Sequence, residues 1–315
     1  MSPEKGVHSI TIDVDQSARA IHGRQQGAKK GYSAKDRNSK LFQVVVWTVR
    51  ETKTVFKLEL LSGEKHSGND FLNRIQKVMD SLKKLGVEIT VVCDSGYENI
   101  AVFEYLNSIK VQFLFAIKQI ETVKKRGKYA KKKTVKKKKG EIATILKERI
   151  LKTKNEFLFR QIFVQNKIAC DEFGQLTFEN FESNEFTNVF VTNLNLSKSN
   201  VYELYKKHAQ VETIIEELKN EFHLAISHNH KFEFNQAMSQ IAAIAYNVKN
   251  MFLSDKKIFQ MKTEIVKLST LQRKFIHIPG IIVNNGGKIF LKVEKRIFDR
   301  LKQYFSKYQC NLSTV

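Results

Sequence analysis

The sequence contains few residues of the kinds that mark secreted, disulfide-linked or zinc-binding proteins. Only three of its 315 residues are cysteine, and only two are proline. Cys93, Cys170 and Cys310 lie far apart and form no C-x-x-C pair, so neither a disulfide framework nor a zinc site is predicted. Pro3 and Pro279 mark no proline-rich linker, and we find no internal repeat.

Long apolar runs are also missing. Runs such as VVVWTV and IAAIAY are far shorter than the roughly 20 residues that span a bilayer. The N-terminal segment lacks the apolar core of a signal peptide. No G-x-x-x-x-G-K-[ST] loop is present, so ATP use is not expected. We therefore expect a cytoplasmic protein without a membrane partner.

Acidic residues are scarce relative to basic ones. The chain has 54 Lys and Arg against 32 Asp and Glu, which gives a formal charge of +22. Such an excess favours a polyanionic partner, most often nucleic acid. Part of it lies in a lysine-rich run at 124–139, where low apolar content predicts a solvated loop. This run is either a solvated face or a sequence-independent contact with DNA phosphates.

Hydrophobic patterns predict an α/β fold. Strands are expected at 8–15, 42–49, 54–61, 87–94 and 111–117, with helices at 68–86 and 98–108. This β-β-β-α-β-α-β order suits a mixed sheet with flanking helices, and by analogy it is the order of the ribonuclease H-like fold. Further strands are expected at 156–165 and 187–194. The tail from 236 alternates helical stretches with one β-like run, KIFLKVE.

Three aspartates lie where predicted strands end. Asp13 and Asp15 close the first strand, and Asp94 closes the fourth. Strand ends of open α/β sheets carry reactive groups, and neighbouring carboxylates repel one another unless a cation lies between them. Oxygen ligands of this kind select Mg²⁺ or Mn²⁺. The alternative is that these are ordinary turn residues, since aspartate is common in turns.

A long helix is predicted over 200–222, with Asn200 as its N-cap. Tyr205, His208, Glu212 and Lys219 fall at offsets that share one helical face. This face suits a phosphate backbone beside a metal ion. It is equally typical of a solvated, salt-bridged helix.

The spacing Tyr205-x2-His208-x3-Glu212-x6-Lys219 resembles the Y-x2-R-x3-E-x6-K signature of bacterial insertion-sequence DDE transposases, of the DDE-domain group 1 type. Other segments resemble one branch of that group, and the resemblance covers nearly the whole chain. They are TIDVDQSARAIHGRQQGAKKGY, VVCDSGYEN, VETIIEELKNEF, FEFNQA, AIAYNV and TLQRKFIHIPGIIV.

The resemblance implies a role for each matching residue. Asp15, Asp94 and Glu212 would form the catalytic triad that holds two Mg²⁺ (or Mn²⁺) ions, with Asp13 the less favoured candidate for the first acid. Tyr205 and Lys219 would grip phosphates at the transposon end. His208 stands where the family has arginine, which would change how the end is recognised.

The resemblance also implies the organisation of the chain. The ribonuclease H-like catalytic core would occupy 1–119 and 199–250. A basic loop and β-rich insertion would lie at 120–198, and a largely helical C-terminal region at 251–315. Relatives carry a helical DNA-binding region ahead of the first acid. We expect this chain to lack it and to bind terminal repeats weakly.

The resemblance implies cleavage of a phosphodiester at the element's end and transfer of the freed 3′-hydroxyl to target DNA. The partners would be double-stranded transposon ends and target DNA, and the chain would act as a homodimer. The alternatives are a metal-dependent nuclease of the same fold and a DNA-binding remnant of a decayed transposase.

Two lesser features complete the sequence-based predictions. A glycine-containing loop at 22–31 is expected beside the first acid, where Arg24, Lys29 and Lys30 would reach DNA. His228 and His230 lie close together in the sequence, but no acid or cysteine is near them. An exposed loop is therefore favoured there over a metal site.

Overall fold

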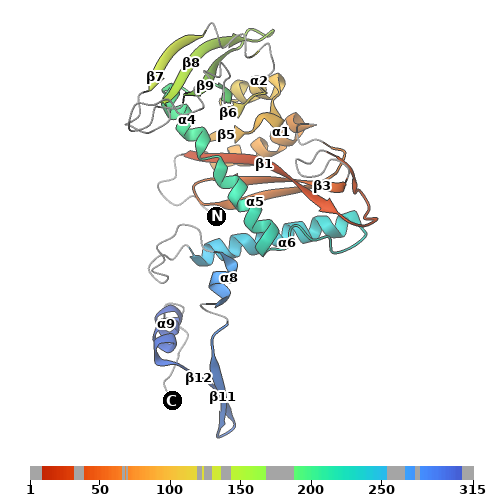
Figure 1. The fold of residues 1–315 in the computed structure, drawn as a ribbon, viewed down its shortest axis with the longest axis vertical. Coiled ribbons are helices and arrows are strands. Elements are labelled where there is room, and N and C mark those ends of the chain that lie inside the picture. The colour runs from red at the N-terminus through yellow and green to blue at the C-terminus, as the bar shows by residue number, and fades with distance from the viewer. Residues whose placement is uncertain are drawn as a thin grey trace, which may run out of the picture.

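The computed structural model describes residues 9–31, 39–65, 68, 70–118, 123, 130–135, 143–167, 188–253, 267–273 and 277–306. In these ranges ten strands form one mixed sheet, and helices cover both of its faces (Figure 1). A separate hairpin belongs to the C-terminal region.

The first strands form the predicted mixed sheet. They are β1 (Ser9–Ile21), β2 (Lys29–Lys30), β3 (Lys40–Val49), β4 (Thr54–Ser62), β5 (Glu88–Cys93) and β6 (Gln112–Ala116). Strand β1 pairs antiparallel with β3 and parallel with β5, while β6 is parallel to β5 and β4 is antiparallel to β3. The order β4-β3-β1-β5-β6 confirms the α/β, ribonuclease H-like arrangement.

Strand β1 is longer than the sequence predicted. It does not end at Asp15 but continues to Ile21, because β3 pairs with it as far as Ile21 opposite Lys40. The parallel neighbour β5 does end early, with Cys93 opposite Val14. Asp15 therefore lies inside β1, at the point where β1 passes the end of β5.

The strands of the region predicted as a β-rich insertion extend the same sheet. Strand β10 (Asn188–Thr192) pairs with β6, and β9 (Leu158–Lys167), β8 (Ala143–Lys152) and β7 (Lys131–Val135) follow in that order. The predicted loop at 124–139 is wrong for Lys131–Val135, which pairs with β8 as an edge strand. An edge strand forms backbone hydrogen bonds with a neighbouring strand on one side only, and lysines are common in such strands. The other residues of that run lie outside the described ranges.

Helices α1 (Phe71–Leu82) and α2 (Ile100–Ser108) pack on one face of the sheet, and α5 (Ala209–Glu221) and α6 (Phe232–Leu253) pack on the other. Ile12 and Val14 of β1 belong to the core beneath α1 and α2. Successive side chains of a strand point to opposite faces. Asp13 and Asp15 therefore face the side of α5.

The helix predicted over 200–222 is two helices, α4 (Lys198–Lys206) and α5. Between them the backbone tightens, since the N–H groups of His208 and Val211 donate to carbonyls three residues earlier. Asn200 is not the cap: the Ser197 side chain accepts a hydrogen bond from the Asn200 N–H, three residues into the helix.

The C-terminal region contains α8 (Leu268–Leu271), the hairpin of β11 (Gly280–Asn285) and β12 (Lys288–Val293), and α9 (Lys295–Ser306). The sequence predicted β12 but not β11. Figure 1 shows the hairpin and α9 lying away from the main sheet. No helix in the described ranges is long and apolar enough to cross a membrane.

Candidate active site

Asp15 and Asp94 are brought together by the register of β1 and β5. Val14 lies opposite Cys93 in the last parallel pair, so the next residues along the two strands are Asp15 and Asp94. Val92 packs in the core beneath α4, and Asp94, two residues later, shares that face. The Asp94 side chain accepts a hydrogen bond of 2.9 Å from the Gly96 N–H and caps the short 3-10 helix Ser95–Tyr97.

Helix α5 contributes Glu212 from above this face. The helix runs alongside β1 and is held to it at both ends. At the start of the helix, Nδ1 of His208 lies 2.7 Å from Oδ1 of Asp13. Near its end, Nζ of Lys219 donates to Ser17 Oγ at 2.6 Å and to the Ala18 carbonyl at 2.7 Å. Glu212 lies between these two anchors and is exposed to solvent.

The three acids influence one another. Burial is the main cause that raises the pKa of Asp15 from 3.8 to about 6, and the charges of Asp94 and Glu212 raise it further. His208 and the Gln16 N–H act in the opposite direction. Of these groups, Glu212 has the smallest effect on the pKa of Asp15. Within the described ranges, no three acidic, histidine or cysteine side chains are close enough to hold an ion together.

The donor set nevertheless fits a divalent cation by its chemistry. Asp15, Asp94 and Glu212 offer hard carboxylate oxygens, which suit Mg²⁺ or Mn²⁺. Burial and then the charges of Asp94 and Glu212 raise the pKa of Asp15, and a cation between the carboxylates would offset their mutual repulsion.

Tyr205 lies beside a cavity next to these acids. Its ring packs on Phe190, with centroids 4.5 Å apart, and near the imidazole of His208, at 5.6 Å. Burial raises the pKa of the Tyr205 hydroxyl, and the charges of Asp94 and Asp15 add to the shift. The cavity has a volume of about 470 Å³ and is lined by Asp94, Ser95, Ala116, Ile117, Lys118, Asn188, Val189 and Tyr205.

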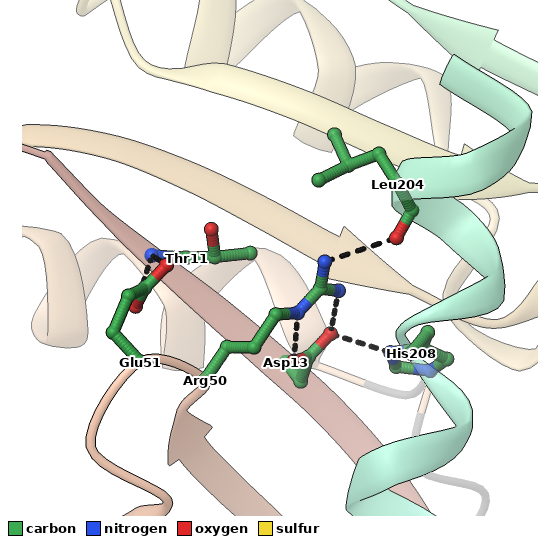
Figure 2. Close-up of polar contacts among 6 residues, drawn as sticks. All are labelled: Thr11, Asp13, Arg50, Glu51, Leu204 and His208. Atoms are coloured by element: carbon green, nitrogen blue, oxygen red, sulfur yellow. Dashed lines mark hydrogen bonds and ion pairs between the residues drawn. The ribbon is translucent and has the colours of Figure 1, made fainter. Parts of the chain in front are cut away.

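Asp13 has an environment unlike that of Asp15 (Figure 2). Arg50 binds it through two nitrogens, with Nε 2.7 Å from Oδ2 and Nη2 2.5 Å from Oδ1. His208 approaches the same Oδ1. Because both carboxylate oxygens are engaged by basic side chains, the geometry favours Asp15 over Asp13 as the first acid of the triad.

Comparison with known proteins identifies the family of the chain. The profile of the family described as Transposase DDE domain group 1 matches residues 2–308. The chain belongs to this transposase family. No curated protein matches the chain significantly.

Two solved transposase structures resemble the chain distantly. The piggyBac transposase synaptic complex with hairpin DNA matches at 10% identity and a TM-score of 0.45, over 98% of this chain and 55% of that one. The Mos1 transposase paired-end complex with the left transposon end matches at 18% identity and a TM-score of 0.24, over 35% of this chain and 36% of that one. The chain thus spans about half the length of the piggyBac chain and about a third of the Mos1 chain.

The sequence predicted the loop at 22–31 to lie beside the first acid, and this prediction is wrong. Because β1 continues to Ile21, the loop begins at His22, seven residues beyond Asp15, or about 23 Å at roughly 3.3 Å per residue. Lys29 and Lys30 form β2 on β3, and Lys29 Nζ pairs with Glu64 at 2.8 Å. Arg24, Lys29 and Lys30 therefore lie away from the acids.

Sequence reasoning missed Arg50 and misplaced His208. Arg50 follows β3 directly and meets Asp13 only because β1 and β3 pair, with Ile12 opposite Val49. The available signal was Asp13 itself, since an aspartate within a buried strand needs a cationic partner. His208 is buried against Asp13. His228 and His230, by contrast, lie in the exposed loop before α6.

Proposed function

We propose that this chain catalyses metal-dependent cleavage and strand transfer of DNA as a DDE transposase. Asp15, Asp94 and Glu212 would hold two Mg²⁺ or Mn²⁺ ions. Such ions, when bound, activate the attacking oxygen and stabilise the leaving oxygen of an in-line displacement. The observation that carries the proposal is the meeting of Asp15 and Asp94 on one face of the sheet, beneath the helix that bears Glu212.

The chain's own residues would bind and orient DNA around this centre. Tyr205 borders the cavity that Asp94 also lines, which suits a terminal nucleotide or its phosphate. Lys219 lies in the last turn of α5, where its ammonium group donates to Ser17 of β1. His208 is buried against Asp13, so the neighbouring exposed Lys207 is proposed to meet the phosphate charge that the family arginine would meet.

The partners follow from the charge and the family. The formal charge of +22 suits contact with double-stranded transposon ends and target DNA. Arg24, Lys29 and Lys30 are proposed as contacts with DNA more distant from the cut site. A homodimer on two DNA ends is part of the same proposal, and so is the division at 1–119, 120–198, 199–250 and 251–315.

Incubation with Mg²⁺, a supercoiled plasmid and a duplex carrying the repeats that flank the gene tests this function. A transposase cleaves the duplex at the repeat and joins it to the plasmid. A nuclease of the same fold nicks DNA without joining. A DNA-binding remnant binds the duplex without cleaving it, and this binding survives Glu212→Ala. Either of the last two results would refute strand transfer.

A further inference from the structure

We propose that Asp13, Arg50 and His208 form a clasp that positions Glu212 relative to Asp15. This inference rests on the proposed function, because it assigns these three side chains to the support of the triad. It also moves His208 from the DNA-contacting role that its place in the signature predicts to an internal, positioning role.

The clasp joins three separate parts of the fold through one carboxylate (Figure 2). Asp13 belongs to β1, Arg50 follows β3, and His208 stands at the junction of α4 and α5. Arg50 binds Asp13 through Nε and Nη2 and donates from Nη1 to the Leu204 carbonyl of α4 at 2.9 Å. Both the strand and the helix junction are therefore held by the same guanidinium.

The backbone around Arg50 is itself fixed to β1. The Arg50 N–H donates to the Thr11 carbonyl at 2.9 Å. In return, the Thr11 N–H donates to the carboxylate of Glu51, at 3.1 and 3.0 Å from its two oxygens. These hydrogen bonds fix the backbone of Arg50, so that its guanidinium group reaches Asp13.

The clasp sets the level of Glu212 along β1. Glu212 is four residues after His208, which in a helix is a rise of about 6 Å at 1.5 Å per residue. Asp15 is two residues after Asp13, which in a strand is an advance of about 6.6 Å. Since His208 contacts Asp13 and α5 runs alongside β1, Glu212 comes level with Asp15. A slip at the clasp would move Glu212 along the strand and away from the other acids.

Burial makes this arrangement specific. Asp13 is 1% exposed, His208 4% and Arg50 9%, so the carboxylate is shielded from water and held by directed hydrogen bonds. Arg50 donates to both oxygens of Asp13, and a carboxylate oxygen accepts hydrogen bonds, so we assign Nδ1 of His208 as the donor to Oδ1. Nε2 of His208 has no hydrogen-bond partner among the described residues. The positioning function therefore depends on a donor at the Nδ1 position.

Two substitutions separate the two nitrogens. In His208→Asn the amide nitrogen takes the place of Nδ1, whereas in His208→Gln it takes the place of Nε2. The test is the Mn²⁺ affinity of the full chain without DNA, measured by electron paramagnetic resonance. We expect His208→Asn to stay within about threefold of wild type. We expect His208→Gln to lose about tenfold or more, as supporting residues of metal ligands typically do.

Matched controls exclude general effects of the substitutions. His230→Asn and His230→Gln alter an exposed histidine in the loop before α6 and should leave Mn²⁺ affinity unchanged. Thermal melting confirms that all variants remain folded. DNA affinity, measured in parallel, should change less than twofold in the His208 variants.

The possible results are distinguishable. Equal loss in both His208 variants, no loss in either, or greater loss in His208→Asn would overturn the clasp while leaving the proposed function intact. Weakened DNA binding with unchanged Mn²⁺ affinity would instead assign His208 to DNA contact. Failure of wild type to bind Mn²⁺ at all would refute the proposed function and the clasp together.

Discussion

Asp13 and Asp15 lie two residues apart on one face of β1, yet their surroundings differ. Arg50 and His208 surround the carboxylate of Asp13. The pKa of Asp15 is raised mainly by its burial; His208 acts against this shift, and the negative charges of Asp94 and Glu212 add to it. Alanine substitution should therefore have different consequences at the two positions.

Asp13→Ala should lower the free energy of unfolding by about 3–5 kcal/mol, because it leaves the buried Arg50 without its carboxylate. Asp15→Ala should have a much smaller effect, since no buried cation loses its partner. Chemical denaturation of both variants measures the difference. Equal destabilisation would contradict the distinct roles assigned to the two acids.

Asp15→Asn should stabilise the metal-free protein at neutral pH. The pKa of Asp15 is raised from 3.8 to about 6 in the folded chain, so the folded state binds this proton more tightly than the unfolded state. Wild-type stability therefore falls as pH rises from about 4 to 6 and stays lowered above that range. Each unit of pKa corresponds to about 1.4 kcal/mol. Because Asp15 is partly exposed, we expect roughly 1–2 kcal/mol.

Melting temperatures from pH 4 to 8, in the presence of a chelator, test this prediction. The advantage of Asp15→Asn should be present at pH 7 and vanish as the pH approaches 4. Added Mg²⁺ should stabilise wild type and have little effect on the variant. A constant difference at every pH would show that titration of Asp15 is not its cause.

At the scale of elements, the position of α5 depends on α6 as well as on β1. Glu217 of α5 and Lys249 of α6 form a buried ion pair. The same region of α6 is joined to β4, where the Asn247 side chain donates to and accepts from the backbone of Val55. These contacts hold the helix that carries Glu212 against the sheet.

Lys249→Met should destabilise the chain by about 3–5 kcal/mol, because the Glu217 carboxylate would remain buried without its ammonium partner. Combining it with Glu217→Leu should restore most of the loss, since no buried charge then remains. Denaturation of the single and double variants forms the test. If the double variant were as unstable as Lys249→Met, the ion pair would not be the source of the effect.

The sequence predicted the elements better than their ends. The alternation in residues 8–15 indicated β1, but its continuation to Ile21 depends on pairing with β3. The apolar stripe of 200–222 indicated helix, but the tightened turn at His208 reflects a contact with Asp13, 195 residues away in sequence. Strand β8, ATILKERILK, was missed because its charged residues conceal a pattern that pairing with β9 makes stable.

The candidate site was accessible to sequence analysis only in part. Asp15, Asp94 and Glu212 follow from family motifs, and the structure brings the first two together through a parallel register that the strand patterns made plausible. The clasp was not accessible, because Arg50 meets Asp13 only after β1 and β3 pair. His208 could not be recognised as buried, because its contact with Asp13 joins residues 195 apart in the sequence.

At the scale of the whole molecule, charge should govern DNA affinity. With a formal charge of +22, binding to a duplex of arbitrary sequence should weaken steeply with salt. About 6–10 phosphate contacts correspond to a loss of roughly 10³–10⁵ in affinity between 50 and 200 mM salt. Fluorescence anisotropy over this range gives the slope. An affinity that barely depends on salt would contradict phosphate contact as the main source of binding.

The central claim is that Asp15, Asp94 and Glu212 together hold the divalent metal ions, and cleavage of the polypeptide by bound iron tests it most directly. Fe²⁺ takes the place of Mg²⁺, and peroxide with ascorbate then cuts the polypeptide near the bound ion. The account predicts cuts near all three acids, suppressed together by excess Mg²⁺ and by Asp15→Asn. Cuts near only one of the three acids, or cuts that Mg²⁺ does not suppress, would contradict it.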